Sequence, residues 1–547
     1  MKRKILILSS LPLLVSCTIS FGGGKTSSEA NQSQSQSQAQ SQSEPQSQSE
    51  PLTLSVKDVS THVYEGVTLN VQNLNDEDYS LTTSGSGIRI EGKTIIPFKA
   101  STENEVTLTT SSGRKATFKV KVENRAYTSK HASAEESEGW FNDVSISPIS
   151  SLTSSFANGM DISSVKQLYD NGQKFYNSDG VEESLFYILK EAGVNWIRLR
   201  LWNDPSDEYE ENGETKTFQY GGGNCDLDHV RWMAHEAKEA GLKILLNFHY
   251  SDFWADPSNQ IIPKAWKDVS TSNELACEVQ DYTTKVLKDL KANDALPDMV
   301  QIGNETYAGM FLHNPGGTTT SATGESPKYT TGKTTRSNGT EAKYDFTGSK
   351  SSNTNLRKYV KAAIDGINAV DSSILKMIHF VKGLADPNTS IKFFQTFDDL
   401  DIDVFGLSAY SYYHWSNLTT LKTGLTTISE AFPTKKICIA ETSYGFTYET
   451  DSWAENTFSK SGTASTISGY PCSIQGQASI IRDATETVSN LQNGFGVFYW
   501  EGAWTPTKYS GWADKSSASS WANQALFSYN GKALGSLGVY KKMQPTT

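Results

Sequence analysis

From about residue 140 onward, short apolar runs alternate with longer stretches in which apolar side chains recur every three or four positions. The short runs predict buried β-strands, and the longer stretches predict amphipathic helices that cover them. In residues 182–192, for example, Leu185, Ile188 and Leu189 fall on one face of a helix. Strands and helices that alternate in this way predict a parallel sheet.

Eight strand candidates can be counted in this part of the chain. They lie near residues 159–161, 196–201, 244–248, 299–303, 377–381, 404–408, 437–440 and 496–499. Eight parallel strands, each followed by a loop or helix, predict an α/β fold of the (β/α)8 TIM-barrel type over residues 140–547. Two polar stretches, 314–353 and 444–476, are predicted to be long loops on the side of the barrel where sites are built.

Residues 52–125 have a different pattern, in which short β-branched runs are separated by turn residues. This pattern predicts a small all-β domain, an immunoglobulin-like sandwich that precedes the barrel. Its last run, residues 116–122, resembles the final strand of bacterial surface modules of that type. We interpret the domain as a spacer, and a carbohydrate-binding role is the alternative.

Residues 1–17 have the composition of an export signal. A basic start is followed by an apolar run, residues 5–15, that is too short for a comfortable membrane span. The run ends in Leu14-Val15-Ser16-Cys17, which resembles the lipobox of bacterial lipoproteins. That resemblance implies cleavage before Cys17 and lipidation of Cys17, whereas an ordinary secretory signal is the alternative. Residues 18–51 are rich in Ser and Gln and are predicted to be a disordered tether.

The composition argues against nucleic acid as a partner, because the formal net charge is −12 and no long basic tract follows the N-terminus. Aromatic residues make up 11% of the chain, which suits stacking on sugar faces as well as filling a large core. None of the four cysteines after Cys17 forms a Cys-x-x-Cys pair, so neither a zinc knuckle nor a redox motif is indicated. Cys438 is predicted to be a core residue. One disulfide is possible among Cys225, Cys277 and Cys472, and the sequence does not assign it.

Two of the predicted strands end in a carboxylate. Residues 299–303 are followed by Asn304 and Glu305, and residues 437–440 are followed by Glu441. A barrel would bring both glutamates to one mouth, and two facing carboxylates are what glycoside hydrolysis requires. One of them must hold a proton for the leaving oxygen, and the other must stay ionised.

The strand near residues 196–201 carries two arginines, Arg198 and Arg200, which point to the same side because the side chains of a strand alternate. A buried arginine needs an anion. We expect Arg200 to lie beside Glu441 and to keep the pKa of that carboxyl low. A structural ion pair with an aspartate is the alternative, above all for Arg198.

Aromatic and imidazole side chains follow two other strands. His249 and Trp254 lie on the loop after the strand near residues 244–248, where a binding loop and a packed structural loop are equal alternatives. Trp500 follows the last strand and is a candidate platform for a sugar ring. For Trp504, a core tryptophan that caps the barrel is a serious alternative.

Four runs of sequence are specific when taken together. They are Gly193-Val194-Asn195-Trp196-Ile197-Arg198-Leu199-Arg200-Leu201-Trp202, His249-Tyr250-Ser251-Asp252-Phe253-Trp254-Ala255-Asp256-Pro257, Val300-Gln301-Ile302-Gly303-Asn304-Glu305 and Phe498-Tyr499-Trp500-Glu501. In these runs, and over roughly residues 156–540, the chain resembles glycoside hydrolase family 53, the endo-β-1,4-galactanases.

This resemblance implies a (β/α)8 barrel that hydrolyses β-1,4-linked galactan, a side chain of type I arabinogalactan in pectin, with retention of configuration. It implies that Glu305 is the acid/base, that Glu441 is the nucleophile and that Asn304 binds the sugar 2-hydroxyl. Four further positions match active-site residues of the family, namely Arg200, His249, His379 and Trp500, and we add Trp254 and Tyr410 as candidate substrate contacts.

The chain departs from the family pattern in several places. After the sixth strand, Ser408-Ala409-Tyr410-Ser411 keeps only the second of the usual two tyrosines. The stretch 314–353 is longer than expected, and residues 449–456 do not preserve the Asp-rich run through which some bacterial members bind calcium. We therefore expect no cofactor and no metal ligand, with a structural calcium ion as the alternative.

The sequence thus predicts a monomeric, lipid-anchored glycoside hydrolase at the extracellular face of the cell envelope, with a polysaccharide as its partner. Two alternatives remain open. One is another retaining enzyme of the same clan, a mannanase, xylanase or cellulase. The other is a non-catalytic surface lipoprotein that binds glycans.

Overall fold

The structure is a computed structural model of the chain, and it describes residues 53–128, 136–211, 213–315, 334–342, 348–349, 353–382, 384–451, 453, 455–512 and 518–545. The predicted signal with Cys17, the tether 18–51 and most of the stretch 314–353 lie outside these residues. Within the described residues, no helix is long and apolar enough to cross a membrane.

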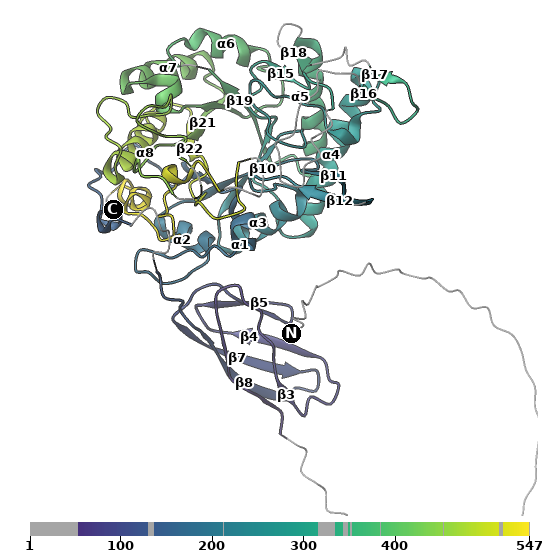
Figure 1. Cartoon of the computed structure of the whole chain (residues 1–547), viewed down its shortest axis with the longest axis vertical. Helices are drawn as coiled ribbons and strands as arrows, with labels where there is room; N and C mark the ends of the chain where they lie inside the picture. Colours follow the sequence, from purple (N-terminus) through teal and green to yellow (C-terminus); the bar gives the residue numbers. More distant parts are fainter. Residues whose placement is uncertain are drawn as a thin grey trace, which may run out of the picture. The chain divides into compact units, whose positions relative to one another are not determined.

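Eight parallel strands close into a barrel (Figure 1). In order around the barrel they are β9 (Ala157–Asp161), β10 (Trp196–Leu201), β13 (Lys243–Phe248), β14 (Met299–Ile302), β19 (Leu375–Val381), β20 (Val404–Ser408), β21 (Lys436–Thr442) and β22 (Gly494–Tyr499). Each lies at a position that the sequence pattern predicts, so the TIM-barrel prediction is confirmed.

Helices surround the barrel and bury their apolar faces against the strands (Figure 1). They are α1 (Val165–Asp170), α2 (Leu185–Ala192), α3 (Leu227–Glu239), α4 (Ser272–Ala292), α5 (Asn353–Asn368), α6 (Pro387–Gln395), α7 (Leu418–Ala431), α8 (Ile474–Ser489) and the short α9 (Val539–Lys542). Local sequence sets their ends. Asp226 caps α3 by accepting a hydrogen bond from the backbone N–H of His229, and Gly193 ends α2 with a left-handed φ of 99°.

The alternation along β10 decides which side chains reach the barrel interior. Ile197, Leu199 and Leu201 pack in the outer core with the helices, whereas Trp196 packs in a separate inner cluster with Met299. Arg198 and Arg200 share the side of Trp196, so they face the interior above this cluster. Cys438 belongs to the same inner cluster, which confirms its prediction as a core residue.

The region before the barrel is all β. Its strands are β1 (Ser55–Val56), β2 (Val59–Thr61), β3 (Val71–Gln72), β4 (Tyr79–Thr83), β5 (Ile88–Glu91), β6 (Thr94–Pro97), β7 (Thr102–Thr110) and β8 (Lys115–Val122). A four-stranded sheet has the order β2-β8-β7-β4, and the pairs β1-β3 and β5-β6 accompany it. Along β8 the buried residues alternate with exposed ones, so one face of the sheet covers a separate core.

Two features of the loops extend the predictions. An antiparallel hairpin, β11 (Ser206–Glu211) and β12 (Glu214–Gln219), follows β10 and was not predicted from the sequence. Cys225, Cys277, Cys438 and Cys472 are free thiols, so no disulfide joins the cysteines that the structure describes.

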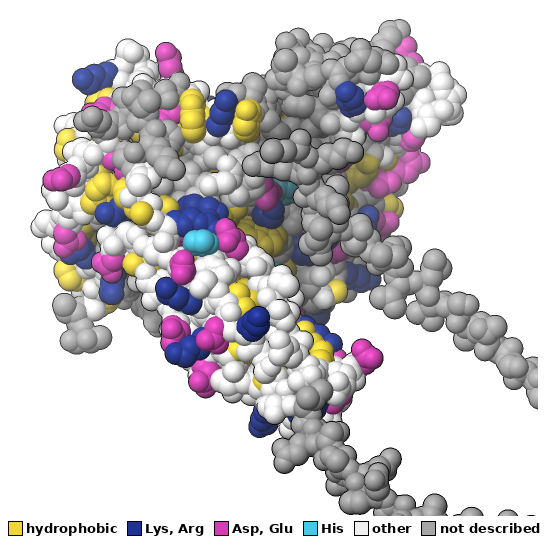
Figure 2. Space-filling model, turned by 60° about the horizontal axis from the view of Figure 1, so that its bottom comes forward, with side chains coloured by type: hydrophobic (Ala, Val, Ile, Leu, Met, Phe, Trp, Pro, Cys, Tyr) yellow, Lys and Arg dark blue, Asp and Glu magenta, His cyan; other side chains and the backbone are white. Residues whose placement is uncertain are grey.

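On the face seen in Figure 2, the acidic and basic side chains of the described residues are interspersed and form no broad basic area. This distribution agrees with the net charge of −12.

Candidate active site

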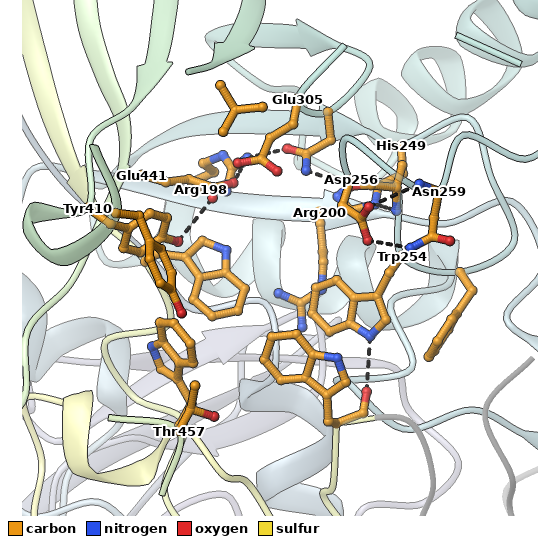
Figure 3. A pocket seen from close by; sticks show the side chains of 18 of the residues that line it. Arg198, Arg200, His249, Trp254, Asp256, Asn259, Glu305, Tyr410, Glu441 and Thr457 are labelled. Atoms are coloured by element: carbon orange, nitrogen blue, oxygen red, sulfur yellow. Dashed lines mark hydrogen bonds and ion pairs between the residues drawn. The ribbon is translucent and has the colours of Figure 1, made fainter. Parts of the chain in front are cut away.

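A pocket of about 680 Å³ opens at the mouth of the barrel. Its lining includes eight of the nine predicted site residues, namely Arg200, His249, Trp254, Asn304, Glu305, Tyr410, Glu441 and Trp500. The ninth, His379 on β19, is fully buried beside the pocket and contacts Asn304. Figure 3 shows Glu305, Glu441 and Arg198 together at one side of the pocket.

Glu441, the penultimate residue of strand β21, accepts hydrogen bonds from two donors. Nη2 of Arg198 lies 2.8 Å from its Oε1, and the hydroxyl of Tyr410 donates to its Oε2 at 3.0 Å. The expectation that Arg200 pairs with Glu441 is therefore wrong, because Arg198 takes that place. Arg200 instead pairs with Glu501, with Nη1 and Oε1 2.5 Å apart.

The expected low pKa of Glu441 is also wrong. Burial raises the pKa of this carboxyl above its ordinary value, and the positive charge of Arg198 opposes that rise without cancelling it. The side chain is 7% exposed, so the loss of hydration outweighs the ion pair.

Glu305 follows β14 with a left-handed φ of 46°, a conformation that lifts its side chain out of the strand alternation. The hydroxyl of Ser408 donates to its Oε1 at 2.6 Å. Burial, followed by the negative charge of Glu441, raises the pKa of Glu305 to about 8. The pair therefore has one carboxyl, Glu305, that holds a proton at neutral pH and one, Glu441, that has an arginine to stabilise its charge.

Asn304 is fixed by its own hydrogen bonds before any substrate binds. Its Oδ1 accepts from Nη2 of Arg198 and from Nε2 of Gln301, both at 3.0 Å, and its Nδ2 donates to the carbonyl of Ala255 at 2.8 Å. Arg198 thus contacts both the nucleophile candidate and the amide beside the acid candidate.

A chain of alternating charges lies beneath the pocket. Asp161, at the end of β9, is 2.8 Å from Nη1 of Arg198 and 3.9 Å from Nη1 of Arg200. Glu501 completes the chain, and Ser164 donates to its second oxygen at 2.7 Å. Burial raises the pKa of Glu501 to about 7, and Arg200 opposes that rise. All of these side chains are at most 1% exposed, so each charge depends on its neighbours.

We predict that Asp161→Asn lowers the free energy of unfolding by about 3–5 kcal/mol, because two buried guanidinium groups lose their shared carboxylate. Chemical denaturation of the whole chain measures the loss. Asp365→Asn is the matched control, since Asp365 pairs with Lys361 on the helix surface and exposed pairs contribute about 0–1 kcal/mol. Equal losses in the two variants would contradict the prediction.

Tryptophans form one wall of the pocket. Trp254 stacks on Trp512 with ring centroids 4.7 Å apart, and its Nε1 donates to the carbonyl of Trp512 at 3.0 Å. The guanidinium of Arg200 lies 4.3 Å from the ring of Trp254. Trp500 also lines the pocket, whereas Trp504 is fully buried, as the core alternative predicted. Trp512, 38% exposed, is a pocket residue that the sequence reasoning missed.

The loop that carries His249 is both packed and part of the site. Nδ1 of His249 accepts hydrogen bonds from Nε1 of Trp202 at 3.1 Å and from the backbone N–H of Ala255 at 3.0 Å. Burial, with the positive charges of Arg200 and Arg198, lowers the pKa of His249 well below its ordinary value. The ring is therefore neutral, and its proton lies on Nε2.

Metal-ligating clusters are not seen in the described part of the chain, where no group of three or more His, Cys, Asp or Glu side chains could hold an ion. The loop expected to hold calcium in some family members, residues 449–456, is described except for residues 452 and 454.

An eight-stranded barrel with two unequal, buried carboxylates at its mouth defines a glycoside hydrolase. The sequence profile of glycosyl hydrolase family 53 matches residues 157–540. The chain therefore belongs to glycosyl hydrolase family 53.

Individual relatives agree with this membership. The chain is 33% identical to the endo-beta-1,4-galactanase of Bacillus subtilis (strain 168) over 449 residues, which cover 75% of this chain and 90% of that protein. It is 29% identical to the arabinogalactan endo-beta-1,4-galactanase of Thermothelomyces thermophilus, with 70% and 98% covered. Among solved structures, the Ignisphaera aggregans GH53 catalytic domain matches with a TM-score of 0.61 and 35% identity, over 74% of this chain and all of that one.

Proposed function

We propose that this glycoside hydrolase is a retaining endo-β-1,4-galactanase that cleaves galactan and the galactan side chains of type I arabinogalactan. The observation that carries the proposal is the unequal carboxylate pair, Glu305 and Glu441, at the mouth of a family 53 barrel. Relatives named as galactanases, which match over most of their own length, support the choice of substrate.

The proposed reaction has two displacements. A carboxylate oxygen of Glu441 bonds to the anomeric carbon while the glycosidic C–O bond breaks, and the leaving oxygen takes the proton of Glu305. Glu305, now ionised, then removes a proton from water, whose oxygen bonds to the anomeric carbon and releases Glu441. Asn304 is positioned to bind the sugar 2-hydroxyl, a contact that strengthens in the transition state.

The product profile on linear β-1,4-galactan tests this function. Thin-layer chromatography should show galacto-oligosaccharides of several lengths, and proton NMR should show the β-anomer first. Mannan, xylan and cellulose are the comparison substrates. Faster release of reducing sugar from one of these polymers would identify the protein as a mannanase, xylanase or cellulase instead. Binding of galactan without product would support a glycan-binding lipoprotein.

We predict a bell-shaped dependence of kcat/KM on pH. The acid form of Glu305 is present below its pKa of about 8, so activity should fall as the pH rises through that value. The ionised form of Glu441 is present above its own raised pKa, so activity should also fall on the acid side. Initial rates on galactan across the pH range check both limbs, and an alkaline limb near the ordinary pKa of a glutamate would contradict the assignment.

We further propose that the chain is a monomer held at the extracellular face of the cell envelope by lipid on Cys17. The lipobox-like run before Cys17 and the Ser- and Gln-rich tether support this placement. The all-β region before the barrel is proposed to be an immunoglobulin-like spacer, on the basis of its four-stranded sheet and its separate core. A mass spectrum of the mature chain that lacks diacylglycerol on Cys17 would overturn the anchor.

A further inference from the structure

Ser408, at the end of β20, joins Glu305 to a chain of buried side chains. Its Oγ lies 2.6 Å from Oε1 of Glu305 and 3.0 Å from Nε2 of His379. Ser408 and His379 are fully buried, so these bonds are not exchanged for bonds to bulk water. A hydroxyl has one proton, so Ser408 donates to one of these neighbours and accepts from the other.

Arg198, at the other end of this series of hydrogen-bonded side chains, sets which groups donate and which accept. A guanidinium group can only donate, and Nε of Arg198 lies 3.1 Å from Oε1 of Gln301. The contact turns the NH2 group of Gln301 toward the carbonyl of Gly303 at 2.9 Å and toward Oδ1 of Asn304 and Nδ1 of His379, both at 3.0 Å. The backbone N–H of Glu305, 3.4 Å away, also donates to Nδ1. Nδ1 therefore accepts a hydrogen bond. Burial, followed by the charge of Arg198, lowers the pKa of His379 well below its ordinary value, so the single proton of the neutral ring lies on Nε2.

Asn304 does not reverse this order, although its Oδ1 lies 3.1 Å from Nδ1 of His379. That oxygen already accepts from Arg198 and Gln301, which fill its two lone pairs. The hydrogen bond from Nδ2 of Asn304 to the carbonyl of Ala255 also fixes which end of the Asn304 amide faces His379. Nδ1 of His379 thus faces two donors, the NH2 group of Gln301 and the backbone N–H of Glu305, and needs no acceptor.

From His379 onward the order is forced: Nε2–H donates to Ser408, and the hydroxyl donates to Oε1 of Glu305. We propose that Ser408 is a positioning residue of the hydrolysis, which keeps the acid's proton on Oε2 of Glu305, the oxygen left for the leaving group. In the reverse order, a proton on Oε1 would point at Ser408 rather than at the substrate. The inference rests on the acid/base role proposed for Glu305.

Other charges also face Glu305. Glu441 on β21 and Asp256 on the loop after β13 raise its pKa, whereas Arg198 on β10 lowers it. The bond from Ser408 stabilises the ionised form and therefore opposes burial. Losing the hydroxyl should raise the pKa of Glu305 and move the alkaline limb of the pH profile to higher pH.

Ser408→Ala in the full chain tests the proposal with two substrates. On galactan, kcat should fall about tenfold with KM nearly unchanged, because the leaving sugar needs a correctly placed proton. On dinitrophenyl β-1,4-galactobioside, whose leaving group needs no proton, kcat/KM should stay within about twofold of wild type. Ser536→Ala is the matched control, since Ser536 is a fully buried serine that donates to Gln477 and does not line the pocket.

The outcomes separate this proposal from the proposed function. Equal losses on both substrates, or an alkaline limb that does not move, would overturn the role of Ser408. Ser408→Thr, which keeps the hydroxyl, should recover the wild-type alkaline limb. If Glu305→Gln itself fails to distinguish the two substrates, the acid/base assignment of Glu305 is at fault instead.

The tautomer of His379 gives a second measurement that needs no folded Ser408 variant. The chain has eight histidines, so a nitrogen NMR spectrum of histidine-labelled protein is simple, and His379→Gln identifies the resonances of interest. We expect a neutral ring with its proton on Nε2 at neutral pH, because burial lowers the pKa of His379 well below its ordinary value. A proton on Nδ1, or on both nitrogens, would overturn the proposed order of donors and acceptors between His379 and Glu305.

Discussion

Glu441→Ala should reduce kcat on galactan by roughly 10⁴- to 10⁶-fold, the range found when an enzyme loses its nucleophile or a close partner of it. The reason is that the other two carboxylates of the pocket are engaged: Glu305 must supply the proton, and both oxygens of Asp256 accept hydrogen bonds within its own loop. The fold should survive the substitution, because Arg198 keeps its ion pair with Asp161. Rates on galactan, with a melting curve beside them, measure the effect.

Small anions give the Glu441→Ala prediction a positive test. Azide can enter the space of the missing carboxylate and attack the anomeric carbon from the same side, so an activated galactobioside should yield an azide of inverted, α configuration. Glu455→Ala is the matched control, because Glu455 is an exposed carboxylate on the loop after the same strand. Near-normal turnover by Glu441→Ala would remove Glu441 from the reaction.

Glu305→Gln should reduce kcat/KM on galactan by roughly 10²- to 10⁴-fold, which is the usual contribution of a general acid. The amide preserves the size of the side chain and still accepts from Ser408, but it cannot transfer a proton. The loss on dinitrophenyl β-1,4-galactobioside should be far smaller, since that leaving group departs as an anion.

The pH profile of the same variant separates a lost acid from a damaged site. With no carboxyl to ionise at this position, Glu305→Gln should lose the alkaline limb near pH 8, while the acid limb from Glu441 stays. A variant that keeps the alkaline limb would show that another group supplies the proton.

The positions of the two glutamates were predictable because the carboxyl ends of all the parallel strands of a barrel lie at the same rim. Each apolar run that ends in a polar residue places that residue at the same rim, so Glu305 and Glu441 could be paired from the pattern alone. Eight of the nine predicted residues line one pocket for the same reason.

The partner of Glu441 was not predictable from one strand. Arg198 and Arg200 both face the interior, and a period of two does not say how deep each lies. The register between β9 and β10 decides it, because Arg198 lies directly opposite Asp161. The barrel then places Arg198 between Asp161 and Glu441, and Arg200 one layer nearer the mouth, beside Glu501.

Trp512 and Ser408 were missed for different reasons. Trp512 lies in an irregular loop after β22, where no periodic pattern gives its direction. Ser408 was visible as the last residue of a predicted strand, but a single serine there carries no sign of what its hydroxyl contacts. Only the position of Glu305, whose left-handed backbone turns it toward β20, gives Ser408 a role.

The tryptophan wall has a practical consequence for ligand measurements. Six of the twelve tryptophans lie in one connected group at the mouth of the barrel, namely Trp202, Trp254, Trp500, Trp504, Trp512 and Trp521. A sugar that displaces water from Trp254, Trp500 or Trp512 changes the surroundings of fluorophores that exchange energy with one another. The intrinsic ultraviolet emission of an inactive variant should therefore report occupancy of the pocket without any attached label.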